Sequence, residues 1–218
     1  PAMAAGMNSV SWNLRYPDAT SFPNMILWGG GVGGPAAPPG TYTVRLTADG
    51  KVQTQPLVVK RHPLYKDVTD ADLQAQFDLA IQIRDKTSEA NNAVIQIRAI
   101  KTQVADRLTK SPDAQLKTSG DKLVPDRRAV EADIYQVKNQ AGQDPLNYPI
   151  KTNNRLASLL SMVNHGDGRP IGNAPVVFKD LVAELKGETD RLTETLLGDL
   201  AAFNTHAKRL GLDPVREK

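Results

Sequence analysis

The residues whose spacing could do chemistry begin with a glycine-rich stretch. Residues 29–34 are Gly-Gly-Gly-Val-Gly-Gly and match the G-x-G-x-x-G pattern of dinucleotide-binding loops. That pattern binds pyrophosphate because a helix begins directly after the glycines and its free N–H groups face the ligand. Here the next five residues are Pro-Ala-Ala-Pro-Pro, which begin no such helix, and no Gly-Lys-Ser/Thr phosphate loop occurs. We therefore expect a flexible or partner-moulded loop in place of a nucleotide site.

No other set of side chains forms a catalytic or metal-binding pattern. The chain has no cysteine, which excludes disulfides, thiolate metal sites and thiol nucleophiles. Its histidines show no i, i+3 or i, i+4 spacing to a second ligand; they are His62, His165 and His206. Paired carboxylates lie where they would complement a helix dipole; they are Asp70 with Asp72 and Asp180 with Glu184. We expect no enzyme activity, no metal and no cofactor.

Composition divides the chain into two regions. The 218 residues are enough for one large domain or two small ones, and no apolar run reaches the roughly 18 residues that span a bilayer. Residues 1–62 hold eight of the 16 glycines, seven of the 15 prolines, and five basic against two acidic side chains. The remaining residues are balanced in charge. The basic excess is local and forms no stripe, so we expect no nucleic-acid binding and no transmembrane segment.

The first region, residues 1–62, has the pattern of an antiparallel β unit. Apolar and polar residues alternate over residues 10–16 and again over residues 42–46, as in strands with one buried face. Asp49-Gly50 predicts a tight hairpin, and residues 52–59 predict the returning strand, in which Pro56 indicates an edge or a bulge. This predicts an Ig-like but incomplete sandwich.

Three or four strands in residues 1–62 are fewer than the roughly seven strands of a complete two-layer sandwich. The chain begins at Pro1 with no initiator methionine or signal-peptide pattern, and we expect further strands upstream. An incomplete sheet exposes unpaired backbone groups, which another chain must cover. We expect a protein partner at this edge.

The second region predicts an antiparallel bundle of about four helices over residues 70–218, after a linker at residues 63–69. Thr69 and Asp72 form a capping-box pattern, and apolar residues then recur every three or four positions until Leu108. Residues 87–92 are the weak spot where this long helix could kink. A second long helix carries the same spacing from Phe178 to Leu210, and shorter helices are expected near residues 130–137 and 156–163, with Pro125 beginning one of them.

Five of the chain's eleven aromatic residues lie in its first 42 residues. Trp12 and Tyr42 are in phase with apolar neighbours and are expected in a core. Phe22 and Trp28 lie in a long irregular stretch, where packing and partner contact are both open. The residues expected to bind a partner come from this stretch and its start: Tyr16, Phe22, Met25, Trp28, Val32 and Pro35.

Three strings resemble a known protein family. They are AGMNSVSWNLRYPDATSFPNMILW and APPGTYTVRLTADGK in the first region and YQVKNQAGQDPLNYPIKTNNRLASL in the second. The first two resemble the Ig-like module that follows the β-propeller of bacterial sortilin-like proteins with BNR repeats, often labelled glycosyl hydrolases. The third is similar to the helical tail of the same proteins. The propeller is missing here, so the resemblance implies no catalytic residue, and it implies an extracytoplasmic (periplasmic or extracellular) location.

We therefore expect a non-catalytic assembly module. It would be a peripheral periplasmic subunit of a membrane complex. A photosynthetic reaction centre with its light-harvesting ring is one candidate complex, although no residue in the sequence specifies it. The alternative is a carbohydrate-associated module of a propeller protein, binding glycan through Trp28 and neighbouring aromatics. A self-contained enzyme is the third hypothesis.

Overall fold

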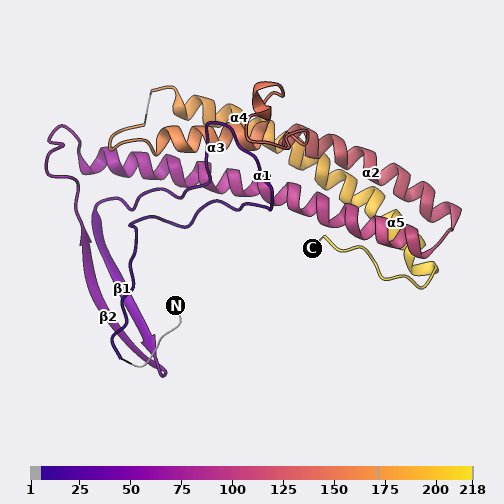
Figure 1. The fold of residues 1–218 in the computed structure, drawn as a ribbon, viewed down its shortest axis with the longest axis horizontal. Coiled ribbons are helices and arrows are strands. Elements are labelled where there is room, and N and C mark those ends of the chain that lie inside the picture. The colour runs from indigo at the N-terminus through magenta and orange to yellow at the C-terminus, as the bar shows by residue number, and fades with distance from the viewer. Residues whose placement is uncertain (1–5, 171, 218) are drawn as a thin grey trace.

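A 41-residue helix forms the axis of the protein, and a β-hairpin projects from the end at which this helix begins (Figure 1). The computed structural model describes residues 6–170 and 172–217, with Pro125 and Asp126 described as backbone only. The elements, in chain order, are β1 (Gly40–Ala48), β2 (Lys51–Val59), α1 (Asp70–Lys110), α2 (Ala114–Ile134), the 3₁₀ turn η1 (Asp144–Leu146), α3 (Thr152–Val163), α4 (Ala174–Thr195), the π-helical turn η2 (Leu196–Leu200) and α5 (Ala201–Arg209).

The long helix α1 begins where the sequence predicts. The Thr69 side chain accepts a hydrogen bond from the Asp72 amide, and the Asp72 carboxylate accepts one from the Thr69 amide, which completes a capping box. At 1.5 Å per residue α1 is about 61 Å long. It does not break at residues 87–92, because the polar side chains there are satisfied: Thr87 Oγ1, for example, donates to the Ile83 carbonyl oxygen at 2.8 Å.

The helices are arranged as three rods. α2 packs along the C-terminal half of α1 and α3 along its N-terminal half, so that the two shorter helices share one side of the long one (Figure 1). α4, η2 and α5 continue one another and form the third rod, which confirms the expected second long helix. α2 begins at Ala114, capped by Asp113, and not at Pro125 as the sequence predicts; Pro125 lies inside it.

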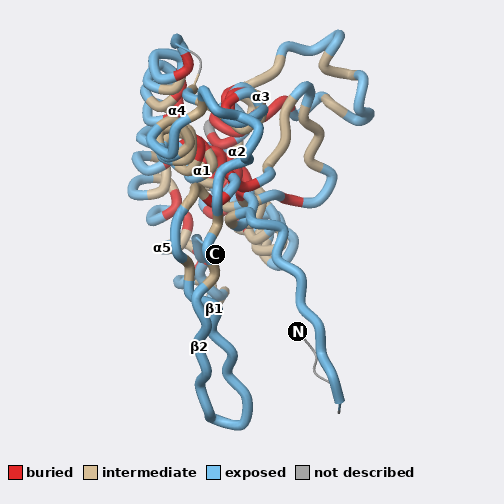
Figure 2. The backbone as a smooth tube through the Cα atoms, turned by 90° about the vertical axis from the view of Figure 1, so that its left-hand side faces the viewer, coloured by how far each residue is buried: buried red, intermediate tan, exposed pale blue. Residues whose placement is uncertain are grey.

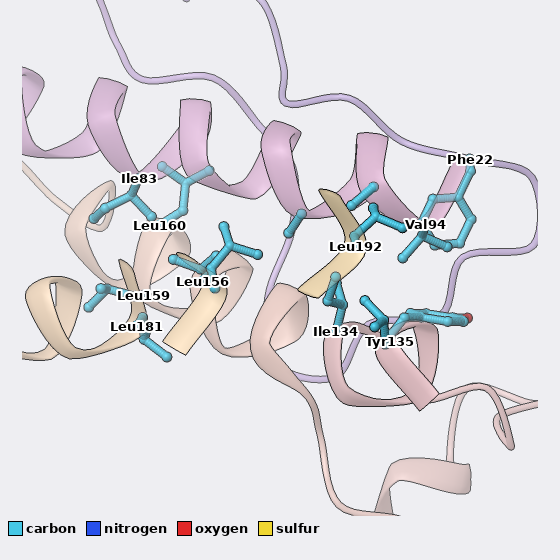
Figure 3. Packing of buried hydrophobic residues seen from close by; sticks show 14 of the residues in the cluster. Phe22, Ile83, Val94, Ile134, Tyr135, Leu156, Leu159, Leu160, Leu181 and Leu192 are labelled. Atoms are coloured by element: carbon cyan, nitrogen blue, oxygen red, sulfur yellow. The ribbon is translucent and has the colours of Figure 1, made fainter. Parts of the chain in front are cut away.

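Two apolar clusters hold the rods together. The first joins α1, α3, α4 and the end of α2, and it includes Phe22 from the N-terminal region (Figure 3). The second joins the C-terminal half of α1 to α2 and α5, and Val215 of the C-terminal tail closes it. Isolated helices are marginal in water, so this burial, rather than helix propensity, stabilises the bundle. None of the helices in the described ranges is long and apolar enough to cross a lipid bilayer.

The β structure consists of one hairpin. β1 and β2 pair antiparallel from Gly40 with Val59 to Ala48 with Lys51, around the predicted Asp49-Gly50 turn. The strand predicted at residues 10–16 does not form: in the described part of the chain, a single bridge joins Arg15 to Ala36. The architecture is thus mixed α and β, with a two-stranded antiparallel sheet and about four helices, two of them long.

Candidate docking site

The hairpin extends away from the bundle into solvent (Figure 2). Its strands are exposed except for three partly buried residues near the base, and its aliphatic side chains remain largely uncovered. The exposed fractions are 52% for Val44, 48% for Leu46, 50% for Val52 and 56% for Val58. An isolated two-stranded hairpin is marginally stable in water, and a third strand or a covering helix is what normally stabilises it. The hairpin therefore exposes aliphatic side chains that neighbouring strands or a covering helix would bury in a larger sheet.

The turn determines which side chains share a face. Asp49 and Gly50 have φ angles of 51° and 73°, as in the type I′ turn that matches the twist of a hairpin. Because directly paired residues lie on the same face, the register separates two faces. The apolar face carries Tyr42, Val44, Leu46, Leu57 and Val59, with Lys51, Gln53 and Gln55 at its distal end; the hydroxyl face carries Thr41, Thr43, Arg45, Thr47 and Thr54, together with Val52, Pro56 and Val58 from β2.

Aromatic contacts anchor the base of the hairpin. The rings of Trp12 and Tyr42 meet edge to face with their centroids 5.6 Å apart, and the Tyr42 hydroxyl donates to the Pro38 carbonyl oxygen at 2.7 Å. Partial burial, together with the nearby Tyr16 hydroxyl, raises the pKa of Tyr42. Trp12 Nε1 donates in turn to the Arg15 carbonyl oxygen at 2.9 Å. The base is thus fixed, while the distal half of the hairpin makes no such contact in the described chain.

The rest of the N-terminal region, residues 15–37, is here called the strap because it lies along the helices. The strap is held by side chains of the bundle that pair with its backbone. Asn91 Nδ2 donates to the Thr20 carbonyl oxygen at 2.7 Å, and the Tyr135 hydroxyl accepts from the Ile26 amide at 3.1 Å. Asn154 makes a hydrogen bond of 2.8 Å to the amide of Trp28 and another of 2.8 Å to its carbonyl oxygen. The strap is therefore an anchored segment.

The glycine run serves close packing. A Cβ atom at Gly34 would lie 2.0 Å from the Tyr16 carbonyl oxygen, and one at Gly30 would lie 2.6 Å from the Ser158 amide nitrogen. Both neighbours are backbone and cannot move aside as a flexible side chain would. Residues 35–39 and then β1 follow this run, so no helix begins directly after the glycines. The run therefore lets the strap pack closely on α3 at Gly30, and it lets two parts of the strap lie backbone to backbone at Gly34 and Tyr16.

The six residues expected to bind a partner have different environments. Phe22 and Pro35 are buried; Tyr16, Met25 and Val32 are partly buried; Trp28 is exposed. Phe22, for which packing and partner contact were both open, packs edge to face on Tyr135 at 5.1 Å under the guanidinium of Arg98 (Figure 3). Tyr16 packs on Phe77 with centroids 4.7 Å apart. Among the six, Trp28 is the most exposed, with 41% of its surface accessible to a partner.

Many charged side chains of the described residues form ion pairs, and a buried acid takes part in two of these pairs. The buried Glu131 carboxylate accepts hydrogen bonds from Arg98 at 2.7 Å and from Lys101 at 2.8 Å. Burial pushes the pKa of Glu131 up, but these two hydrogen bonds outweigh it and the net shift is downward. Within residues 6–170 and 172–217 no group of three His, Asp or Glu side chains could hold a metal ion.

A surface groove of about 910 Å³ between α1 and the α4–η2 rod was not foreseen from the sequence. Its lining includes Leu196 and Leu197 from the π-helical turn, and its charged lining residues are acidic. Two of these acids are neutralised by neighbours: Arg84 pairs with Asp85 at 2.8 Å and Lys86 with Glu89 at 2.6 Å. The π-helical turn that places Leu197 at the surface has no signal in the apolar periodicity.

Comparisons with known proteins assign no family: no family model, no curated protein and no solved structure matches this chain.

Proposed function

We propose that this chain is a non-catalytic assembly module, which docks its hairpin on another protein and uses the helical bundle as a rigid brace. The observation that carries the proposal is the hairpin itself, since about half of the surface of Val44, Leu46, Val52 and Val58 is exposed in a two-stranded sheet. Exposed strand edges with apolar side chains pair with other chains or aggregate unless they are covered. Coverage by a partner in a permanent complex accounts for both the open strand edge and the exposed aliphatic side chains, which lie on both faces of the hairpin.

The finer parts of the proposal rest on the resemblance stated above. In an Ig-like arrangement the hairpin would supply two strands of a sheet and the partner the rest. The resemblance also supports an extracytoplasmic site of action, as a peripheral periplasmic subunit of a membrane complex. A photosynthetic reaction centre with its light-harvesting ring is one complex of this kind.

Site-specific photo-cross-linking in the producing cells tests the proposal. A benzophenone amino acid replaces Val44 or Val52 in the hairpin, and the exposed Lys179 on α4 serves as the control position. Both hairpin probes are expected to attach to the same protein, which should also co-purify with the chain in fixed stoichiometry. Adducts at Lys179 but not at the hairpin, or a lone monomer in gentle extracts, would contradict the proposal.

The exposed ring of Trp28 favours one second candidate, a carbohydrate-associated module. Aromatic rings exposed at a surface can stack on sugar rings, and 41% of Trp28 is exposed. Glycan-array binding that disappears in Trp28→Ala but survives a charge reversal at Arg45 would support this candidate. Unchanged glycan binding in Trp28→Ala would remove it.

A further inference from the structure

We propose that the docking partner adds a β-strand to the outer edge of β1, and that this strand carries aliphatic side chains on one face and acidic side chains on the other. The inference rests on the proposed function and names the edge and the chemistry of the partner.

The register shows which backbone groups are free to pair. In a hairpin with a two-residue turn, the residues flanking the turn exchange both hydrogen bonds, and every second pair after them does the same. Ala48 with Lys51 is such a pair, so the intervening residues point their N–H and C=O groups away from the other strand. On β1 the outward-facing residues are Thr41, Thr43, Arg45 and Thr47; on β2 they are Val52, Thr54, Pro56 and Val58.

Pro56 makes the two edges unequal. It has no N–H, so the outer edge of β2 lacks a donor near its middle, and the pyrrolidine ring obstructs a strand that approaches there. Natural proteins protect exposed edges with proline in this way. The outer edge of β1 keeps all four donors and all four acceptors, and no residue in the described chain pairs with them. A partner strand therefore finds a complete edge on β1 only.

The side chains of β1 indicate the partner's pattern. A strand laid beside β1 alternates its side chains between the same two faces. On the apolar face these side chains would adjoin Val44 and Leu46, and on the hydroxyl face they would adjoin Arg45, which has no ion-pair partner among the described residues. Arg45 is the one charged side chain on the hydroxyl face of the paired strands. A partner strand with aliphatic side chains on one face would match Val44 and Leu46, and acidic side chains on its other face would match Arg45.

A second copy of this chain fits the edge less well. Two β1 strands paired with each other would bring two Arg45 side chains together on the same face, and like charges across strands are destabilising. The proposed occupant is therefore a different protein, with an acidic extended segment.

Two matched proline variants of the full chain test the edge assignment. Thr43→Pro removes an outward N–H from β1, and Thr54→Pro removes one from β2, while both keep the bonds inside the hairpin because these N–H groups point outward. The probe is a terminally blocked seven-residue peptide in which valine alternates with glutamate and threonine; the control peptide has lysine in place of glutamate. Binding is followed by amide resonances of the hairpin, and the Trp12–Tyr42 ring contact reports that the hairpin is intact in each variant.

The acidic peptide is expected to shift the amides of Thr41, Thr43, Arg45 and Thr47. We expect Thr43→Pro to weaken its binding at least about tenfold and Thr54→Pro to leave it within about twofold, and the lysine peptide to bind at least about tenfold more weakly. The inference would be overturned if the shifts were confined to β2, if both variants lost binding equally, or if both peptides bound equally well. It would also be overturned if millimolar peptide caused no shift, or if the chain alone formed a dimer that Thr43→Pro dissolves. The photo-cross-linking experiment separates this from the proposed function: if Val44 and Val52 probes still capture the native partner in Thr43→Pro, the edge assignment fails while hairpin docking stands.

Discussion

Trp28 and Asn154 are joined by a reciprocal pair of hydrogen bonds. The Asn154 side-chain oxygen accepts from the Trp28 amide at 2.8 Å, and its Nδ2 donates to the Trp28 carbonyl oxygen at 2.8 Å. One carboxamide on α3 thus satisfies both backbone groups of a strap residue, as a neighbouring strand would. Asn204 does the same for the amide and carbonyl of Val215 in the C-terminal tail. Side-chain amides therefore hold both irregular ends of the chain on the helices.

Asn154→Ala is expected to lower the free energy of unfolding by about 2 kcal/mol, because it removes both hydrogen bonds to Trp28 and leaves the Trp28 amide unpaired, while the carbonyl oxygen keeps its bond from Ser158 Oγ. Urea denaturation measures the loss, and hydrogen exchange at the Trp28 amide should quicken. Asn164→Ala is the matched control, since Asn164 is more loosely bonded to the strap, at 3.3 Å from the Gly33 carbonyl oxygen, and should cost no more than about 0.5 kcal/mol. An equal loss in both variants would contradict the anchoring role of Asn154.

Gly34→Ala is expected to destabilise the protein by about 2–3 kcal/mol, because its Cβ would lie 2.0 Å from the Tyr16 carbonyl oxygen and 2.6 Å from that of Pro17. At the neighbouring Gly33 a Cβ meets nothing within 4 Å, so Gly33→Ala should change stability by less than about 0.5 kcal/mol. Thermal unfolding followed by circular dichroism compares the two. Equal melting temperatures would show that the run is a loose loop.

Arg127→Met is expected to stabilise the protein by about 1–3 kcal/mol. Arg127 lies on the core side of α2 with 0% exposure, and none of its three guanidinium nitrogens has a hydrogen-bond partner among the described residues. Burial lowers the pKa of Arg127 to about 10, against the weaker opposing attraction of Asp199 and Glu217. Methionine fills a similar volume without a charge that needs a partner. Arg128→Met, at an exposed neighbouring position, is the control and should leave the melting temperature nearly unchanged. A lower melting temperature in Arg127→Met would show that the guanidinium is satisfied in solution.

Glu131 should make the protein sensitive to acid. Its pKa is lowered in the folded state by hydrogen bonds from Lys101 and Arg98, which outweigh the opposing effect of burial. Its contribution is therefore fully present above the unfolded-state pKa of about 4.3 and is lost as pH falls through the folded-state value. Glu131→Gln should cost about 2 kcal/mol at pH 7, and in chemical denaturation series this difference should shrink as the pH falls below about 4.

Glu188 serves as a control, because its pKa is shifted in the opposite direction to that of Glu131. Burial raises the pKa of Glu188, against the attraction of Arg191, so its charged form is disfavoured in the folded state. Glu188→Gln should therefore leave stability unchanged or higher at pH 7. A pH-independent difference between the parent and Glu131→Gln would rule out the ion cluster as its source.

Elements with local signals were predicted well. The capping box of Thr69 and Asp72 locates the start of α1, and Asp49-Gly50 locates the turn between β1 and β2. The start of α2 was missed because Asp113, a cap that accepts from the Gln115 and Leu116 amides, has no following acidic partner to mark it. The candidate docking region was predicted only in outline: an incomplete sheet with an open edge was expected, but the strand placed at residues 10–16 was wrong, and the burial of Phe22 against Tyr135 was not decided.

The sequence by itself determined where helices and the hairpin form, because capping residues, turn residues and apolar periodicity act between neighbours in the chain. Only the tertiary structure decided that residues 10–16 form the single Arg15–Ala36 bridge in place of a strand, that Arg127 lies in a core with no hydrogen-bond partner among the described side chains, and that Asn154 binds the backbone of Trp28. Each of these depends on groups far apart in the sequence, and no local pattern records which of them will meet. The exposed outer edge of β1 belongs to the same class, since a strand pairs or stays open according to what lies beside it in space.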